Sequence, residues 1–325
     1  MERITREILQ QKGLRRVAVL RGGESDEAAV SRVSAKAVSS ALKEEGFEVE
    51  ELEADRTLAA TLSAFSPDVA FLATHGGGGE NGSLQGFLET MKIPYTGSGV
   101  LGSAIGMSKM RSRALFRERG LAVPLTYAHM SGHPFKTESI SFDPPYMVKP
   151  ESAGSSIGIM RVGERTGLSD AVNEAGKYSR WVLVEQNISG REIQSAVLDD
   201  RFIGAIEVIP EISEPFYTYN SKYAPGGSRH ICPAPLSETL LEELAAATLE
   251  AHRILELRGC SRLDTILGED GTFVILEINT LPGLTPTSLV PEIARTAGLS
   301  FKDLLMSLLG TAQLDSDRAP AFSFR

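Results

Sequence analysis

The first hundred residues alternate short apolar runs with amphipathic stretches. Residues 17–20, 47–52 and 69–73 are each predicted to be a strand. A helix is predicted over residues 30–42, where apolar residues recur at every third or fourth position, and Gly46 ends it. Strands that alternate with helices indicate a parallel, doubly wound sheet, and such sheets bind ligands beyond the carboxyl ends of their strands.

Two glycine-bearing turns follow predicted strands. Residues 21–27 (RGGESDE) come directly after the first strand, and residues 74–79 (THGGGG) come after the third. Both turns therefore lie at the edge of the sheet where a ligand site is expected.

From residue 108 the pattern changes to that of hairpins. A helix is predicted over residues 108–119, capped by Ser108 and ended by Gly120. Further strands are predicted at residues 145–149, 159–162, 181–186, 192–198 and 202–209. The last two form a hairpin around Asp199-Asp200, so this region should be antiparallel.

A long segment at residues 210–235 is rich in Pro, Gly and aromatic residues. A loop of that length in a compact enzyme is usually a lid or a binding loop. Beyond it we predict a helix over residues 237–258, a hairpin over 262–279 and a helical region near 291–309. The tail from Gly310 is polar and is expected to be frayed.

Composition narrows the class of protein. At 325 residues the chain exceeds the about 250–300 residues that one core supports, so two or three domains are expected. A net charge of −9 argues against a general binder of nucleic acid or anionic membranes, although a local basic groove could hold phosphates. Cys232 and Cys260 lie outside any metal-ligand spacing and are expected to be free thiols. No signal peptide or membrane-spanning run is present, so we expect a soluble, cytoplasmic protein.

The hairpin over residues 262–279 gathers oxygen-bearing side chains on one face. Pairing Leu267 with Thr272 across the turn puts Asp264 opposite Ile275. Because side chains alternate between faces, four polar residues should share a face: Asp264, Glu277, Asn279 and Arg262. Two charged oxygen ligands and one neutral ligand suit Mg²⁺ that is shared with substrate phosphates.

The alternative for this hairpin is a solvated face that carries a chance ion pair. It is disfavoured because the other face is expected to be too apolar for an exposed edge. That apolar face is predicted to consist of Leu263, Ile266, Val274, Leu276 and Ile278.

Two lysines are candidates for phosphate binding. Lys149 ends an apolar strand and is followed by the small-residue turn 151–158 (ESAGSSIG), whose backbone N–H groups could hold phosphate oxygens. The turn does not have the Walker pattern, and most turns rich in Gly and Ser are only turns. Lys109 begins the helix capped by Ser108, a place where surface lysines are also common.

Four of the chain's 21 aromatic residues fall within residues 216–223 (FYTYNSKY). One interpretation is a lid that excludes water and brings Lys222 to a phosphate. The alternative is a loop that is packed permanently on the core.

Taken together, these motifs resemble those of the D-alanine–D-alanine ligases of the ATP-grasp superfamily. The matching stretches occur in family order at residues 22–31, 75–86, 94–103, 108–112, 149–158, 217–223, 262–264 and 277–289. The resemblance implies an α/β fold (α+β overall) with a Rossmann-like, doubly wound parallel domain over residues 1–106, followed by a two-lobed ATP-grasp with antiparallel sheets. The implied boundaries are 107–188 for the central lobe, 189–312 for the C-terminal lobe with a lid at about 210–235, and 313–325 for a disordered tail.

The resemblance also implies the reaction, in the synthesis of peptidoglycan precursors. The carboxylate of one D-alanine would attack the γ-phosphate of ATP to form an acyl phosphate. The amine of a second D-alanine would then displace phosphate. ATP is needed because a carboxylate is a poor electrophile. The family further implies a homodimer.

Roles can be carried over residue by residue. Glu27 matches the residue that holds the first substrate's ammonium group and hydrogen-bonds with those matching Ser155 and Tyr223. The Arg262 guanidinium and the Gly283 N–H match the groups that stabilise the tetrahedral oxyanion.

The other matches concern the second substrate, the nucleotide and the metal. Ser288 matches the residue that binds the second substrate's carboxylate, and His75 lies on the substrate side. The implied nucleotide-binding residues are Lys109, Lys149, Ser155, Ser156, Glu185, Glu192 and Lys222. Asp264, Glu277 and Asn279 match the ligands of two Mg²⁺ ions, for which Mn²⁺ can substitute.

The chain departs from the family pattern in two places. Residues 27–31 read EAAVS where the family usually has a further pair of opposite charges, and Asn187 stands where some members place a large aromatic over the adenine. Tyr223 favours dipeptide formation over the D-alanine–D-lactate or D-alanine–D-serine ligases, which share the scaffold. A catalytically silent nucleotide-binding protein is the remaining alternative, and it is disfavoured because Arg262 and the metal ligands are present.

Overall fold

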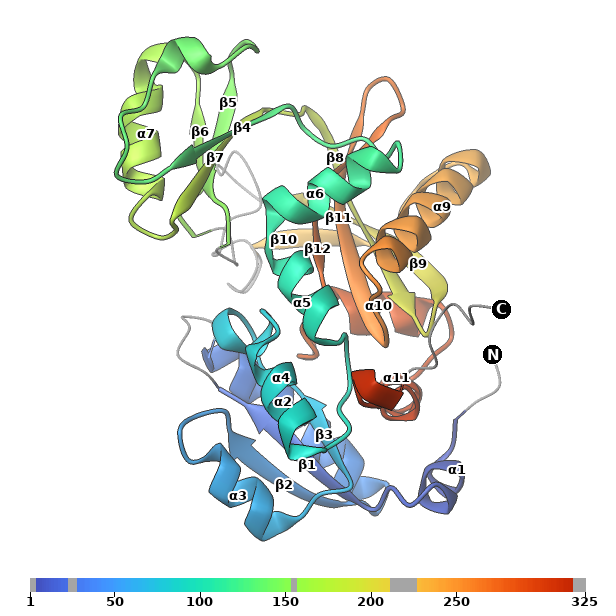
Figure 1. Cartoon of the computed structure of the whole chain (residues 1–325). Helices are drawn as coiled ribbons and strands as arrows, with labels where there is room; N and C mark the ends of the chain where they lie inside the picture. The colour runs from blue at the N-terminus through green and yellow to red at the C-terminus, as the bar shows by residue number, and fades with distance from the viewer. Residues whose placement is uncertain (1–3, 23–27, 153–156, 211–226, 318–325) are drawn as a thin grey trace, which may run out of the picture.

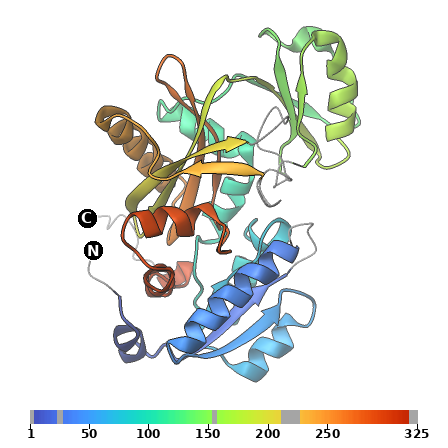
Figure 2. The ribbon, with the colours of Figure 1, turned by 180° about the vertical axis from the view of Figure 1, so that it is seen from behind.

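The computed structural model describes residues 4–22, 28–152, 157–210 and 227–317. Within these residues the chain forms three sheets, each of which is the centre of one structural unit (Figure 1, and Figure 2 from behind). One sheet is parallel and two are antiparallel, as the hydrophobic pattern predicts. The α/β fold class is thereby confirmed.

The N-terminal unit is a parallel sheet with the strand order β2-β1-β3. Val17 and Val19 of β1 point to the face that α2 covers, whereas Ala18 and Leu20 point to the face that α3 and α4 cover. Helices on both faces make this sheet doubly wound. Its elements are α1 (Arg6–Gln11), β1 (Arg16–Arg21), α2 (Ala28–Glu44), β2 (Glu48–Glu53), α3 (Leu58–Phe65), β3 (Val69–Leu72) and α4 (Ser83–Met91).

The central unit is an antiparallel sheet with the strand order β4-β7-β5-β6, covered by α7. Tyr146 and Val148 of β5 and Val184 of β7 are fully buried against Leu168 and Val172 of α7. Its elements are β4 (Thr126–Met130), β5 (Tyr146–Pro150), β6 (Met160–Val162), α7 (Leu168–Ala175) and β7 (Trp181–Gln186).

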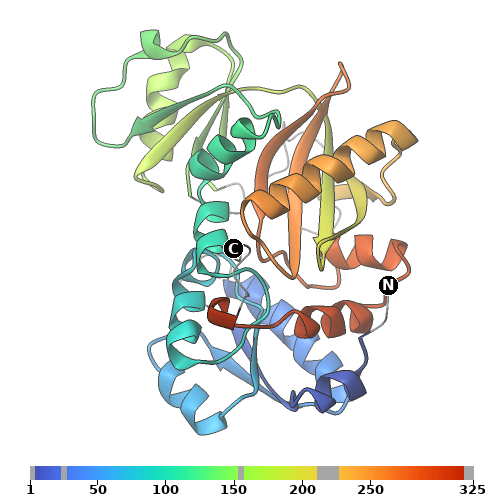
Figure 3. The same ribbon diagram turned by 45° about the vertical axis from the view of Figure 1, so that its right-hand side comes forward.

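The C-terminal unit is an antiparallel sheet with the strand order β10-β9-β8-β11-β12. One face packs against α9, where the hydroxyls of Ser195 and Thr248 lie 2.8 Å apart. The other face packs against α10, and α10 and α11 join it to the N-terminal unit in one continuous core (Figure 3). Its elements are β8 (Gly190–Leu198), β9 (Arg201–Pro210), β10 (Ser228–Ile231), α9 (Glu238–Ile254), β11 (Cys260–Gly268), β12 (Phe273–Asn279), α10 (Leu289–Thr296) and α11 (Phe301–Gly310).

Two helices connect the units. These are α5 (Val100–Met107) and α6 (Lys109–Glu118), and the hydroxyl of Ser108 caps α6 by accepting from the N–H of Arg111. Although α6 precedes the central sheet in the chain, its buried Phe116 packs against Leu263 and Ile278 of the C-terminal sheet. The boundaries at residues 106, 188 and 312 stay predictions.

Two expectations about the chain's irregular parts were wrong. The predicted loop over residues 210–235 contains a strand, β10, which pairs with β9; residues 211–226 lie outside the described part. The tail is not frayed where it is described. Gln313 forms a bridge with Tyr95, Leu314 is buried, and Asp315 accepts a hydrogen bond from the N–H of Val100 at 2.9 Å. Contacts that are distant in sequence order these residues, so local polarity did not reveal them.

Short helices also escaped prediction. The hydrophobic pattern did not predict α3, α4 or α5, because eight or nine residues hold only two turns of the apolar period. Among the helices of the described residues, none combines the length and apolar character needed to cross a membrane. Cys232 and Cys260 are free thiols, and Cys260 is buried.

Candidate active site

A cavity of about 710 Å³ is lined by residues of the central and C-terminal sheets. Its apolar lining includes Met147, Ile159, Ile188 and Leu276. Its charged lining consists of Lys109, Lys149, Arg161, Glu185, Arg191, Glu192, Glu207, Asp264 and Glu277. An apolar cavity with a few convergent charged groups is the usual form of a small-molecule site.

Two of the three predicted metal residues, Asp264 of β11 and Glu277 of β12, line this cavity, but the predicted strand register was wrong. Asp264 pairs with Glu277 rather than with Ile275, and Arg262 pairs with Asn279. At the turn Leu267 pairs with Phe273 instead of Thr272, a shift of one residue, and a bulge adds a second shift of one residue after Asp264. Together the two shifts move the pairing by two residues, which preserves the alternation of side chains between the faces of the sheet. Asp264 and Glu277 therefore still face the same cavity.

The apolar face of this hairpin also needs correction. Ile266 and Leu276 were assigned to the face opposite the metal residues, yet both line the cavity. Ile266 lies two residues from Asp264 and therefore points the same way, while Leu276 is the extra residue of the bulge. The face packed against α6 and α9 includes Leu263, Ile275 and Ile278, and Leu267 and Phe273 continue it along α9.

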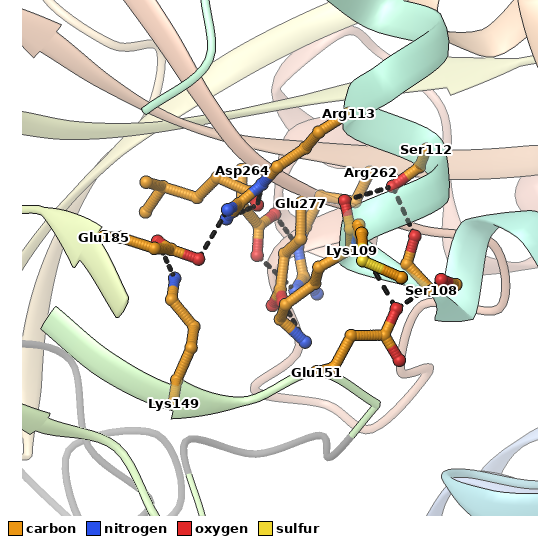
Figure 4. A network of polar contacts seen from close by, with 12 residues as sticks. Ser108, Lys109, Ser112, Arg113, Lys149, Glu151, Glu185, Arg262, Asp264 and Glu277 are labelled. Atoms are coloured by element: carbon orange, nitrogen blue, oxygen red, sulfur yellow. Dashed lines mark hydrogen bonds and ion pairs between the residues drawn. The ribbon is translucent and has the colours of Figure 1, made fainter. Parts of the chain in front are cut away.

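Each carboxylate of this pair is matched by a cation (Figure 4). Lys109 Nζ lies 2.9 Å from Glu277 Oε2. Arg262 binds Asp264 with two hydrogen bonds, Nε to Oδ1 at 2.7 Å and Nη2 to Oδ2 at 2.9 Å. The fork of the guanidinium matches the two carboxylate oxygens and fixes the orientation of both side chains.

A second charged group connects the central sheet to α6. Glu185 of β7 accepts from Lys149 Nζ at 2.7 Å on one oxygen and from Arg113 of α6 on the other. Burial would raise the pKa of Glu185, but the charges of Arg113 and Lys149 more than offset it and hold that pKa below its usual range. Burial lowers the pKa of Lys149, although Glu185 opposes the shift. Glu185 is therefore a buried carboxylate shared by two cations.

Two polar residues of this network were missed by the sequence analysis. Arg113 is 2% exposed, and the signal for it was its position four residues after Lys109, on the same face of the helix. Glu151 is also buried; it accepts from the Ser108 hydroxyl and from the N–H of Met110 at 3.3 Å (Figure 4). Glu151 thus ties the start of the small-residue turn to the first turn of α6.

The residues predicted on the substrate side lie close together beyond β12. An atom placed as Cβ on Gly283 would be 2.8 Å from Ser288 Oγ and 3.9 Å from His75 Cε1. Ser288 precedes α10, and its hydroxyl accepts from the N–H of Thr285 at 3.0 Å. The structure thus brings His75, Gly283 and Ser288 together from segments about 200 residues apart in the chain.

His75 is held by two further residues. Its Nε2 lies 3.1 Å from the Ser34 hydroxyl, and its Nδ1 lies 3.4 Å from Glu80 Oε1. The same Ser34 hydroxyl accepts from the N–H of Leu284 at 3.4 Å. Helix α2 therefore fixes both the imidazole and the loop that contains Gly283.

The oxygen donors near Glu277 fit a hard divalent cation. Asp264 and Glu277 are directly paired across the strands, and Asn279 lies two pairs further along, opposite Arg262. Among the described residues no three His, Cys, Asp or Glu side chains converge as a metal-binding group, and the third ligand predicted from the sequence, Asn279, is a neutral oxygen donor. The amide oxygen of Asn279, which accepts from the N–H of Leu281 at 3.1 Å, supplies such a donor. Two carboxylates and an amide oxygen are a donor set that Mg²⁺ accepts together with phosphate oxygens.

The remaining predicted site residues divide into two groups. Glu192 lines the cavity, and its Oε1 accepts from Gln194 Nε2 at 2.9 Å. Five others lie outside the described residues: Glu27, Ser155, Ser156, Lys222 and Tyr223. Their predicted roles stay predictions.

Comparison with known proteins gave consistent matches. The model of the D-ala D-ala ligase C-terminus matches residues 115–310, and the model of the D-ala D-ala ligase N-terminus matches residues 50–98. A D-alanine–D-alanine ligase from Anaeromyxobacter dehalogenans (strain 2CP-1) is 45% identical over 92% of this chain and 97% of the relative. One from Geotalea uraniireducens is 42% identical over 92% of this chain and 96% of the relative.

Solved structures that are similar to this chain point to the same family. The D-alanine–D-alanine ligase from Bacillus anthracis superposes with a TM-score of 0.81 at 29% identity, covering 91% of this chain and 97% of that one. The structure of a ligase from the same organism complexed with ATP superposes with a TM-score of 0.80 at 28% identity, covering 92% and 96%.

Proposed function

The chain belongs to the D-alanine–D-alanine ligase family and is therefore an ATP-dependent ligase, and we propose that it joins two D-alanine molecules with the residues described above. A carboxylate oxygen of the first D-alanine attacks the γ-phosphorus of ATP, and ADP leaves. The amine of the second D-alanine attacks the carbonyl carbon of the acyl phosphate. The tetrahedral adduct then expels phosphate, and D-alanyl-D-alanine remains.

The cavity between the sheets is the proposed nucleotide site. Lys149 and Lys109 would contact phosphate oxygens, with Glu185 and Glu192 toward the adenine and ribose; all four line the cavity. ATP in the complex of the Bacillus anthracis relative supports a nucleotide in this chain as well. The two lysines now bind Glu185 and Glu277, so ATP phosphates would replace carboxylates as their partners.

Asp264, Glu277 and Asn279 are proposed to hold two Mg²⁺ ions, with Mn²⁺ as a substitute. When bound, Mg²⁺ would neutralise charge on the transferring phosphoryl group. The family resemblance and the donor set described above support this assignment.

The acyl-transfer half of the site is proposed to lie around Gly283. The N–H of Gly283 and the Arg262 guanidinium would donate to the oxyanion of the tetrahedral adduct. The Ser288 hydroxyl, 2.8 Å from a Cβ position on Gly283, would bind the carboxylate of the second D-alanine. Glu27, Ser155 and Tyr223 are proposed for the first D-alanine from the resemblance alone, and His75 is proposed to complete this side.

One observation carries the proposal: the paired carboxylates of Asp264 and Glu277 face a cavity that Lys109 and Lys149 also line. The test is ADP release from saturating ATP and Mg²⁺ at neutral pH, with D-alanine alone and then with D-lactate or D-serine added. We expect release with D-alanine alone and a dipeptide product identified by mass. Release at background level with D-alanine would refute the function. A mixed product formed in preference to the dipeptide would refute the choice of second substrate.

The cellular setting is also a proposal. The reaction would supply a precursor of peptidoglycan, and its ATP and D-alanine would be drawn from the cytoplasm. A homodimer is proposed from the family resemblance, and light scattering of the purified chain would test it.

A further inference from the structure

We propose that Arg113 is a positioning residue that holds the metal-binding strand and the Glu185–Lys149 pair in their working arrangement. The inference rests on the proposed function, because it assigns the cavity to a nucleotide. Arg113 is one helical turn beyond Lys109 on α6, and its guanidinium reaches both β12 and β7 (Figure 4).

The guanidinium is buried, and its hydrogen bonds go to two residues that line the cavity, Leu276 and Glu185. Nε donates to the Leu276 carbonyl at 2.9 Å, Nη2 donates to the same oxygen, and Nη1 donates to Glu185 Oε1. A buried cation is costly unless it is paired and hydrogen-bonded. The planar fork of arginine can satisfy two acceptors in different directions, whereas a lysine ammonium can act only as a point charge.

The contact with Leu276 acts on the metal residues. Leu276 is the extra residue of the bulge and has no partner in the β11–β12 ladder, and β12 is the edge strand of its sheet. The bulge is what sets Glu277 directly opposite Asp264. By binding the Leu276 carbonyl, Arg113 fixes the backbone next to Glu277 and hence the spacing of the two carboxylates.

The contact with Glu185 acts on the phosphate lysine. Glu185 is 1% exposed and its two oxygens are shared by Arg113 and Lys149. If Lys149 turns to a phosphate, Arg113 still neutralises the buried carboxylate. Without Arg113, movement of Lys149 to a phosphate would leave the buried Glu185 carboxylate without a counter-charge. Lys149 would therefore stay bound to Glu185.

The effects of the two contacts of Arg113, with Leu276 and with Glu185, should therefore be separable by experiment. Arg113→Met removes both contacts. Arg113→Lys keeps a charge beside Glu185 but loses the paired donation to Leu276. Arg117→Met is the matched control, because Arg117 is one turn further along the same helix and is exposed.

Two quantities are measured on the full chain: the Kd of ADP without Mg²⁺, by calorimetry, and the Mg²⁺ concentration for half-maximal ADP release. We expect Arg113→Met to weaken ADP binding about tenfold, the effect of losing a hydrogen bond between charged groups. We expect Arg113→Lys to bind ADP nearly as the unchanged chain does but to need roughly tenfold more Mg²⁺. Arg117→Met should match the unchanged chain in both.

The inference would be overturned if both Arg113 variants kept the ADP affinity and the Mg²⁺ requirement of the unchanged chain. It would also be overturned if Arg113→Lys weakened ADP binding as much as it raised the Mg²⁺ requirement, or if that variant weakened ADP binding alone. If Arg113→Met does not fold, the measurements on Arg113→Lys alone test the inference. If the unchanged chain binds no ADP, the nucleotide cavity itself is refuted and this inference falls with it. Failure of the ligation assay with ADP binding intact would refute only the choice of substrate.

Discussion

Lys109 Nζ, in the first turn of α6, lies 2.9 Å from Glu277 Oε2 on β12. The cation proposed for a phosphate and the carboxylate proposed for Mg²⁺ thus neutralise each other. Lys149 and Glu185, on β5 and β7, form an equivalent pair at 2.7 Å and also line the cavity. Binding of ATP with Mg²⁺ would replace both pairs with stronger multivalent contacts, so the protein's own charges prepare the site.

Glu277→Gln should abolish turnover while changing stability little. The Glu277 side chain is 31% exposed and lies at the cavity surface, so the fold depends on it weakly. Loss of a carboxylate ligand should lower kcat by about a hundredfold or more. The measurements are ADP release and urea unfolding, with Glu269→Gln in the exposed hairpin turn as control. Equal losses of activity and stability would instead indicate that Glu277 is part of a structural ion pair.

Removing Glu185 should destabilise the fold more than removing Lys149. Glu185→Gln leaves the buried cations Arg113 and Lys149 without a counter-charge, a change worth about 3 kcal/mol or more. Lys149→Met leaves Glu185 still bound to Arg113, so it should destabilise less while raising the KM for ATP. The free energy of unfolding in urea decides the order. The reverse order would show that Arg113 and Glu185 are not a self-sufficient pair.

Gly283→Ala should reduce activity through a steric effect on Ser288. The added Cβ would lie 2.8 Å from Ser288 Oγ, closer than van der Waals contact permits, so the hydroxyl must move. A displacement of this size should lower kcat/KM for the second D-alanine by about tenfold to a hundredfold. Gly163→Ala is the control, because its Cβ would meet nothing within 4 Å. Equal activity of the two variants would place the second substrate elsewhere.

The stability of the fold should fall between pH 6.5 and 4 because of His252. Burial lowers the pKa of this histidine from 6.5 to about 4, although Asp200, with Oδ1 3.3 Å from Nε2, opposes the shift. In this window the unfolded chain binds a proton that the folded chain excludes, so unfolding becomes easier as the pH falls. The linked free energy is about 3 kcal/mol.

This linkage is tested by urea unfolding at several pH values. The advantage of the unchanged chain over His252→Gln should shrink as the pH falls from 7.5 to 4. His133→Gln, at an exposed position, should keep the pH dependence of the unchanged chain. A constant difference between the unchanged chain and His252→Gln would show that this histidine does not titrate in the window.

The sequence by itself determined the classes of element and much of the chemistry. The alternation of predicted strands with helices indicated the parallel N-terminal sheet, and predicted strands that follow one another as hairpins indicated the antiparallel region. Asp264 and Glu277 were predicted to share a face, and they do although the predicted register was wrong, because two shifts of one residue preserve the alternation of side chains. The sequence pattern was also sufficient to recognise the family before the fold was known.

Only the tertiary structure determined which side chains from distant segments face one another. Register depends on the turn and on the bulge at Leu276, and the pattern of residues 262–279 did not reveal that bulge. In the sequence Arg113 is one of several cations on a predicted helix. Only the packing of α6 between two sheets buries it against Glu185. His75, Gly283 and Ser288 meet because α2, α10 and Leu284 of the loop after β12 share a core. Contacts between distant segments depend on the packing of the whole chain, which local periodicity does not encode.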